Sequence, residues 1–152
     1  MGFRMNLRKL LTEDGIILAL KGNTKQDIIA EMIDLLVVKG SIKDREAALK
    51  AVIEREQKMS TGMQHGIAIP HGKTDSVDKL VVALALKKEG VDFEAMDRKP
   101  STIFVMTLSS LSRTGPHIQF LSEISQVLND PVKRDALLKA QTTGQVIDIL
   151  TS

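Results

Sequence analysis

The sequence predicts one α/β domain in which helices cover both faces of a β-sheet. Residues 80–86 and 102–108 are apolar at nearly every position, which is typical of strands covered on both faces. About five other segments carry apolar residues at helical spacing and are expected to form helices. With four strands in all, and without an internal repeat or linker, the chain is expected to fold as one layered helix–sheet–helix domain.

The first part of the chain is expected to hold a strand and two helices. Residues 16–20 form a short apolar run between glycines and predict the first strand. Thr24 begins a sequence that resembles a capping box and opens a helix, which Gly40 is placed to end. Asp44 begins a second helix that runs to about Lys58. The inward face of this second helix is expected to consist of Ala47, Ala48, Ala51 and Val52.

Residues 62–72 differ in composition from the segments around them. They contain three glycines, one proline and two histidines around the apolar triplet at positions 67–69. This composition predicts a loop, a short strand and a second loop. The two buried strands follow, and a turn at residues 97–100 separates them.

Three helices are expected after the second buried strand. Pro116 suits the first turn of a helix. Its buried stripe is expected to consist of Ile118, Leu121, Ile124 and Leu128. Asp130 precedes a helix that ends near Lys139, and Thr143 opens a last helix that ends near Leu150.

Composition excludes several classes of function. The chain has no cysteine, which excludes disulfides, thiolate metal sites and cysteine nucleophiles and fits the expected cytoplasmic location. Its formal charge is +2, and it has four Phe but no Trp or Tyr, so nucleic-acid binding is not expected. No apolar run approaches the about 20 residues that span a bilayer, and residues 1–6 lack the apolar core of a signal peptide. Membrane insertion is therefore not expected.

The most informative segment surrounds His71. Its sequence is Gly66-Ile67-Ala68-Ile69-Pro70-His71-Gly72-Lys73. Pro70 restricts the residue before it to an extended form, and Gly72 removes a Cβ from the space beside the ring. We therefore expect His71 at the end of a strand with open space next to it. Neutral imidazole is a competent nucleophile at neutral pH, so His71 is a candidate phosphoryl acceptor.

His117 and Arg55 could complete an anion site around His71. His117 follows Pro116 in the first turn of a helix, where free N–H groups and the positive end of the helix dipole attract anions. Arg55 could add a fixed positive charge. Phosphoryl transfer depends on positioning and charge neutralisation, which this set could supply without a metal. From spacing alone, ordinary loop and surface histidines are the more frequent explanation.

Further sequence motifs accompany Arg55, His71 and His117. Arg55 is followed by Ser60-Thr61-Gly62, then by the run that ends in Pro70-His71-Gly72, and later by Gly90-Val91-Asp92-Phe93-Glu94-Ala95-Met96-Asp97 and the helix that starts at His117. These motifs resemble the fructose/mannitol-type enzyme IIA component (EIIA) of the bacterial phosphotransferase system (PTS), a family that includes a nitrogen-regulatory branch. The resemblance covers nearly the whole chain, so residues 1–152 are expected to be a single type-2 EIIA domain.

The resemblance carries expectations about fold and activity. It implies a three-layer α/β/α sandwich with a mixed β-sheet and a phosphotransferase activity. His71 would accept a phosphoryl group from phosphorylated HPr, hold it as tele-phosphohistidine and pass it to a cysteine of a IIB component for sugar uptake. His117 would stabilise the phosphoryl group, and Arg55 would provide supporting charge. No metal and no cofactor beyond the transient phosphohistidine is implied.

Other functions remain open on the sequence. A nitrogen-type regulatory IIA protein would be phosphorylated on His71 but would act by binding a target protein. An interaction domain without chemistry is disfavoured because His71, His117 and Arg55 are all present. A zinc hydrolase would use His65 as a third histidine ligand, although a solvated loop position is the favoured interpretation of His65. Lys73 and Arg113 flank the candidate site and could attract acidic partners.

Overall fold

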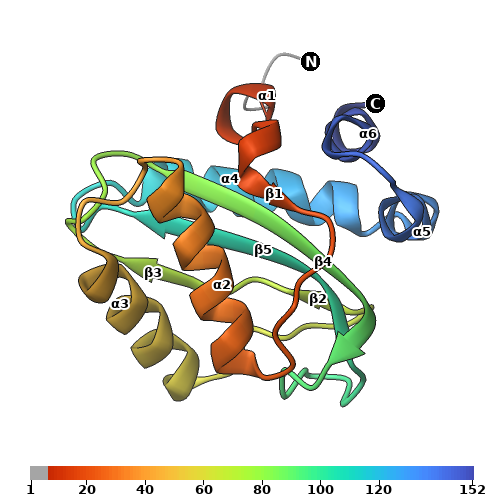
Figure 1. Cartoon of the computed structure of the whole chain (residues 1–152), viewed down its shortest axis with the longest axis horizontal. Helices are drawn as coiled ribbons and strands as arrows, with labels where there is room; N and C mark the ends of the chain where they lie inside the picture. Colours follow the sequence, from red (N-terminus) through yellow and green to blue (C-terminus); the bar gives the residue numbers. More distant parts are fainter. Residues whose placement is uncertain (1–6) are drawn as a thin grey trace.

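The computed structural model describes residues 7–152, and this part of the chain is built around one mixed β-sheet (Figure 1). Its strands are β1 (Ile16–Ile17), β2 (Ile67–Ala68), β3 (His71–Lys73), β4 (Val81–Val91) and β5 (Ser101–Ser109). The strand order is β1-β4-β5-β2, and β3 also pairs with β5. β4 and β5 are antiparallel, whereas β1 is parallel to β4, and β2 and β3 are both parallel to β5. The expected mixed sheet is therefore confirmed.

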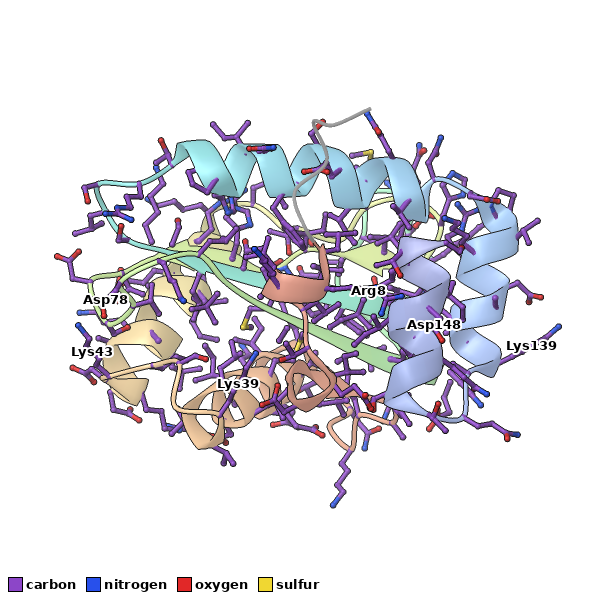
Figure 2. The ribbon with its side chains drawn as sticks, turned by 90° about the horizontal axis from the view of Figure 1, so that it is seen from above. Arg8, Lys39, Lys43, Asp78, Lys139 and Asp148 are labelled. Carbon is purple, nitrogen blue, oxygen red and sulfur yellow. The ribbon has the colours of Figure 1, made fainter. Side chains whose placement is uncertain are left out.

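Helices cover both faces of the sheet, which makes the domain a three-layer α/β/α sandwich. In the view of Figure 2, α4 (Gly115–Leu128) lies on one side of the sheet and α2 (Lys25–Val38) and α3 (Arg45–Lys58) on the other. The remaining helices are the one-turn α1 (Leu7–Leu10), the 3₁₀ helix η1 (Glu13–Gly15), α5 (Pro131–Lys139) and α6 (Thr143–Thr151). The predicted fold class is thus the observed one.

Alternate side chains of the two central strands supply two separate cores. Val82, Leu84 and Leu86 of β4 belong to the cluster that contains Phe120 and Ile124 of α4. The neighbouring positions of β4 belong to the cluster under α2 and α3: Val81, Ala83 and Ala85. A strand that is buried on both faces needs apolar residues at successive positions, which explains the continuous apolar run.

The starts and ends of the helices follow the local signals in the sequence. Thr24 caps α2, and its side chain accepts a hydrogen bond from the N–H of Asp27 at 3.1 Å. Gly40 follows the end of α2 at φ +84°, a left-handed conformation that glycine adopts without a Cβ clash. Asp44 and Asp130 cap α3 and α5 through their side chains. These predictions are confirmed, because each capping signal acts within a few residues.

The strands depart from prediction more than the helices do. β1 contains two residues rather than five, although the N–H of Leu20 still donates to the carbonyl of Leu86 at 2.9 Å. β4 extends past Leu86 to Val91 through a register irregularity. A fifth strand, β3, begins at His71, where a loop was expected. Pairing with β5 creates this strand, and local sequence does not encode such a long-range contact.

Two predicted helix faces need correction. Ile118 is 64% exposed, whereas the buried residues of α4 are His117, Phe120, Ile124, Val127 and Leu128. The buried stripe is rotated so that His117, rather than Ile118, faces the interior. Ala47 of α3 is likewise exposed, and Glu56 takes a place on the buried face with Ala48 and Val52. Both errors arise because apolar residues that border a stripe can be assigned to it from periodicity alone.

The first and last elements of the described chain contact each other. Arg8 of α1 forms an ion pair with Asp148 of α6 at 3.2 Å, and these residues are neighbours in Figure 2. The hydroxyl of Thr143 donates to Glu13 in η1 at 2.7 Å. Within residues 7–152, no helix is long and apolar enough to cross a membrane. The expectation about a signal peptide at residues 1–6 lies outside the described residues.

Candidate functional site

His71 is the first residue of β3 and is half-buried at the side of β5. The register pairs His71 with Thr107, and the N–H of Thr107 donates to the carbonyl of Pro70 at 3.2 Å. The Nδ1 atom of His71 lies 2.9 Å from the carbonyl oxygen of Ile69. A carbonyl can only accept, so Nδ1 carries the proton in this hydrogen bond. In the neutral ring, the lone pair available for nucleophilic attack is therefore on Nε2.

Gly72 allows α3 to approach β3 closely. A Cβ at this position would lie 3.1 Å from the backbone carbon of Ala51 and from the backbone nitrogen of Val52. This spacing is tighter than ordinary contact, so a side chain at position 72 would push α3 and β3 apart. The glycine thus fixes the distance between the strand that carries His71 and the helix that carries Arg55.

His117 lies beside His71, in the first turn of α4. The two ring centroids are 5.3 Å apart, and the rings are tilted by 42°. The hydroxyl oxygen of Thr107 lies 3.1 Å from Nδ1 of His117, and both residues are buried. Burial lowers the pKa of His117, and the positive charges of His71 and Lys73 lower it further. His117 therefore favours the neutral form at neutral pH.

The N-terminus of α4 adds backbone donors to this site. Thr114 occupies the N-cap position, but its side chain makes no capping hydrogen bond. Pro116 has no N–H, whereas Gly115 and His117 each carry one in the first turn. The positive end of the helix dipole therefore lies next to the two imidazoles, where it favours a bound anion.

Arg55 is in the last turn of α3, and its guanidinium is held by its own helix end. Nη1 donates to the carbonyl of Met59 at 2.8 Å. Within residues 7–152, Arg55 forms no hydrogen bond to His71 or His117. The structure thus brings the two histidines together and leaves Arg55 bound to the loop that follows α3.

A buried carboxylate anchors that loop. Glu56 accepts hydrogen bonds from the N–H of Thr61 at 2.8 Å, from the hydroxyl of Thr61 at 2.6 Å and from Nζ of Lys25 at 2.9 Å. Lys25 also reaches Glu94 at 3.0 Å and lies 4.8 Å from the ring centroid of Phe93. These contacts connect α2, α3 and the chain leading to β2 next to Arg55.

The three other candidate residues, Lys73, Arg113 and His65, are all exposed. Lys73 is exposed on β3, and its charge is one of those that lower the pKa of His117. Arg113 is exposed in the loop between β5 and α4. His65 is exposed in a turn at φ +64°, and its N–H donates to Asp97 at 3.2 Å. In the described part of the chain, no three His, Asp or Glu side chains are grouped so as to hold a metal ion.

The sequence patterns do not single out Thr107 or Glu56, which position the predicted residues. Thr107 is the polar residue within the apolar stretch 103–108 of β5, and Glu56 is an acidic residue four positions after Val52 on a buried helix face. In both cases the available signal is a polar side chain at a position that the apolar pattern marks as buried. Such residues are usually hydrogen-bonded, and here they are.

Comparison with known proteins assigns the chain to a family. Residues 9–152 match the family model described as "Phosphoenolpyruvate-dependent sugar phosphotransferase system, EIIA 2". The chain belongs to this EIIA family. The family assignment made from the sequence is therefore confirmed.

Individual relatives come from two branches of the family. A Haloferax volcanii protein named PTS system fructose-specific EIIA component is 43% identical over 127 residues, which make up 84% of this chain and 82% of the relative. A Bacillus subtilis fructose-specific EIIABC component is 36% identical over 146 residues, which make up 96% of this chain and 23% of that longer protein. The crystal structure of the nitrogen regulatory protein IIA-Ntr from Neisseria meningitidis matches with a TM-score of 0.88 and 27% identity, over 96% of this chain and 99% of that one.

Proposed function

We propose that this EIIA protein is a phosphoryl carrier in which Nε2 of His71 receives a phosphoryl group from phosphorylated HPr and passes it to a IIB component. In the first step, the P–N bond of the donor phosphohistidine breaks as a P–N bond to His71 forms. In the second step, that bond breaks as a P–S bond to a IIB cysteine forms. The protein would therefore act between two proteins and would not bind the sugar.

The observation that carries this proposal is the hydrogen bond between Nδ1 of His71 and the carbonyl of Ile69. It holds the ring in one orientation and leaves the Nε2 lone pair for attack on phosphorus. Because the ring is already oriented, less entropy is lost on reaching the transition state.

The surroundings of His71 suit the charge of a phosphoryl group. His117, with its ring centroid 5.3 Å away, offers a second imidazole, and the first turn of α4 offers backbone N–H groups. Lys73 on the same short strand contributes positive charge, and Arg55 contributes more from the end of α3. Loose transition states of phosphoryl transfer depend on this kind of charge neutralisation.

A IIB component is the acceptor that the relatives favour. The Bacillus subtilis relative carries the matching region within a protein named EIIABC, and the Haloferax volcanii relative is named fructose-specific. The higher identity to these two proteins supports a role in sugar transport, with fructose as the first candidate. The match to IIA-Ntr supports a second candidate, in which phosphorylation of His71 controls binding to a target protein.

The proposal is tested by the intact mass of the protein after incubation with phosphoenolpyruvate, enzyme I and HPr. We expect the wild type to gain one acid-labile phosphoryl group and His71→Ala to gain none. His65→Ala is the matched control, since it removes an exposed loop histidine and should gain the group normally. If the wild type gains nothing from active HPr, the carrier proposal is overturned.

Addition of a purified fructose-type IIB component then separates the two candidates. Loss of the phosphoryl group from His71 to a IIB cysteine supports transport, whereas its retention on His71 supports the regulatory role. In this second reaction, we expect His117→Ala to accept the phosphoryl group and to transfer it more slowly than the wild type.

A further inference from the structure

We propose that Thr107 is a positioning residue that holds the proton of His117 on Nε2, so that this ring donates a hydrogen bond to the phosphoryl group on His71. The role toward the phosphoryl group rests on the function proposed above, whereas the control of the proton position does not. Thr107 touches neither the donor nor the acceptor protein in this proposal and acts through His117 alone.

Thr107 contacts both histidines, one through its backbone and the other through its side chain. It pairs in register with His71 through the parallel contact of β3 with β5. Its side chain is fully buried, and its Oγ1 lies 3.1 Å from Nδ1 of His117. One strand residue thus fixes the backbone beside the first imidazole and the side chain of the second.

The direction of the hydrogen bond follows from what else the hydroxyl can reach. Within residues 7–152, the ring nitrogen of His117 is the hydrogen-bond partner of the Thr107 hydroxyl. If Nδ1 donated to the hydroxyl, the buried hydroxyl proton of Thr107 would have no acceptor. An unsatisfied buried donor is costly, and it is rarer in proteins than an acceptor with a spare lone pair. Thr107 therefore donates to Nδ1, and the neutral ring carries its proton on Nε2.

The Nε2 atoms of the two imidazoles consequently have opposite hydrogen-bonding roles. Nδ1–H of His71 donates to the carbonyl of Ile69, so Nε2 of His71 carries a lone pair. His117 receives a proton from Thr107 at Nδ1, so its Nε2 is a donor. A phosphoryl group formed on the first ring would thus meet an N–H of the second, while His117 stays uncharged.

Nitrogen-15 NMR of the histidine side chains tests this assignment in the unphosphorylated protein above neutral pH. We expect wild-type His117 to give a protonated Nε2 and an unprotonated Nδ1 that accepts a hydrogen bond. In Thr107→Val, which keeps the branched shape but loses the hydroxyl, the two nitrogen shifts should move toward each other as the ring exchanges between tautomers. Thr107→Ser should restore the wild-type pattern.

Ser109→Ala is the matched control. Ser109 lies two residues further along β5, its hydroxyl is buried and it has no hydrogen-bond partner among the described residues. Loss of this hydroxyl should leave the His117 signals unchanged. A proton on Nδ1 in the wild type, or the same spectrum in the wild type and Thr107→Val, would overturn the proposal.

A kinetic measurement then tests the link to the phosphoryl group. Transfer from phosphorylated His71 to IIB should be about tenfold slower in Thr107→Val, the loss expected for one buried hydrogen bond, and near normal in Thr107→Ser. Equal rates in wild type and Thr107→Val would overturn the role of this proton in transfer. If the wild type accepts no phosphoryl group at all, the proposed function fails, and the NMR spectra still decide whether Thr107 sets the proton position.

Discussion

His71 and His117 differ in the hydrogen bond that each Nδ1 makes, and this difference gives the two rings different chemistry. The carbonyl of Ile69 can only accept, whereas the hydroxyl of Thr107 can donate. A pair of histidines side by side would be a symmetric site without these two partners. The sequence places a histidine after Pro70 and another after Pro116, but the partners that distinguish them come from elsewhere in the fold.

The lowered pKa of His117 predicts a pH dependence of stability. Its ordinary value is about 6.5, and burial, with the charges of His71 and Lys73, lowers it in the folded protein. The unfolded chain then binds the proton more readily than the folded one. The contribution of His117 to stability is therefore complete above about pH 6.5 and is lost as the pH falls through the lowered pKa of the folded state.

Urea unfolding followed by circular dichroism, from about pH 8 to about pH 5, measures this effect. The free energy of unfolding of the wild type should fall more steeply with decreasing pH than that of His117→Gln. His65 and His71 are present in both proteins, so the comparison isolates the contribution of His117. Parallel curves for the two proteins would contradict the prediction.

At the scale of the elements, helices were more predictable than strands because their signals are local. Thr24, Asp44 and Asp130 each cap a helix within their own few residues, and the sequence predicts a helix start at all three. β3 exists because residues 71–73 pair with β5, more than 30 positions later in the chain, and no local pattern encodes that contact. The candidate site shows the same division, since Pro70 and Gly72 mark His71, whereas its distance to His117 and the contact with Thr107 depend on tertiary structure.

The junction between α3 and β2 depends on one buried carboxylate. The side chain of Glu56 is 3% exposed and holds Lys25 and the backbone of Thr61. Glu56→Ala would leave the buried N–H and hydroxyl of Thr61 without their acceptor, while Lys25 would keep its ion pair with Glu94. Because an unsatisfied buried donor is costly, the free energy of unfolding should fall by about 1–3 kcal/mol. Urea unfolding at neutral pH measures this loss.

Glu54→Ala provides the control on the same helix. Glu54 is exposed and lies 3.8 Å from Lys50 in a surface pair, so its removal should cost less than about 1 kcal/mol. Both substitutions introduce alanine into α3 and so change helix propensity alike. Similar losses in the two variants would show that the contacts of Glu56 do not hold this junction together.

At the scale of the whole molecule, β4 and β5 contribute to both cores. One cluster lies between the sheet and α4, α5 and α6, and the other lies between the sheet and α2 and α3. His71 on β3 and His117 on α4 reach the same site from the sheet and from the first of these layers, whereas Arg55 belongs to the second. Relative movement of the layers would therefore disturb the site, and the shared strands oppose such movement.

Because both layers pack on the same two strands, we expect them to unfold together. Phe120 of α4 and Met32 of α2 are fully buried in different cores. Phe120→Ala should cost about 3–5 kcal/mol and Met32→Ala about 2–5 kcal/mol. In amide hydrogen exchange, each substitution should reduce the protection of the slowest amides in β4, β5 and the helices of both layers, since these amides exchange through complete unfolding. If Phe120→Ala loosened only α4, α5 and α6 while α2 and α3 kept their protection, the two layers would be separate cooperative units, and the sheet would not couple the two sides of the candidate site.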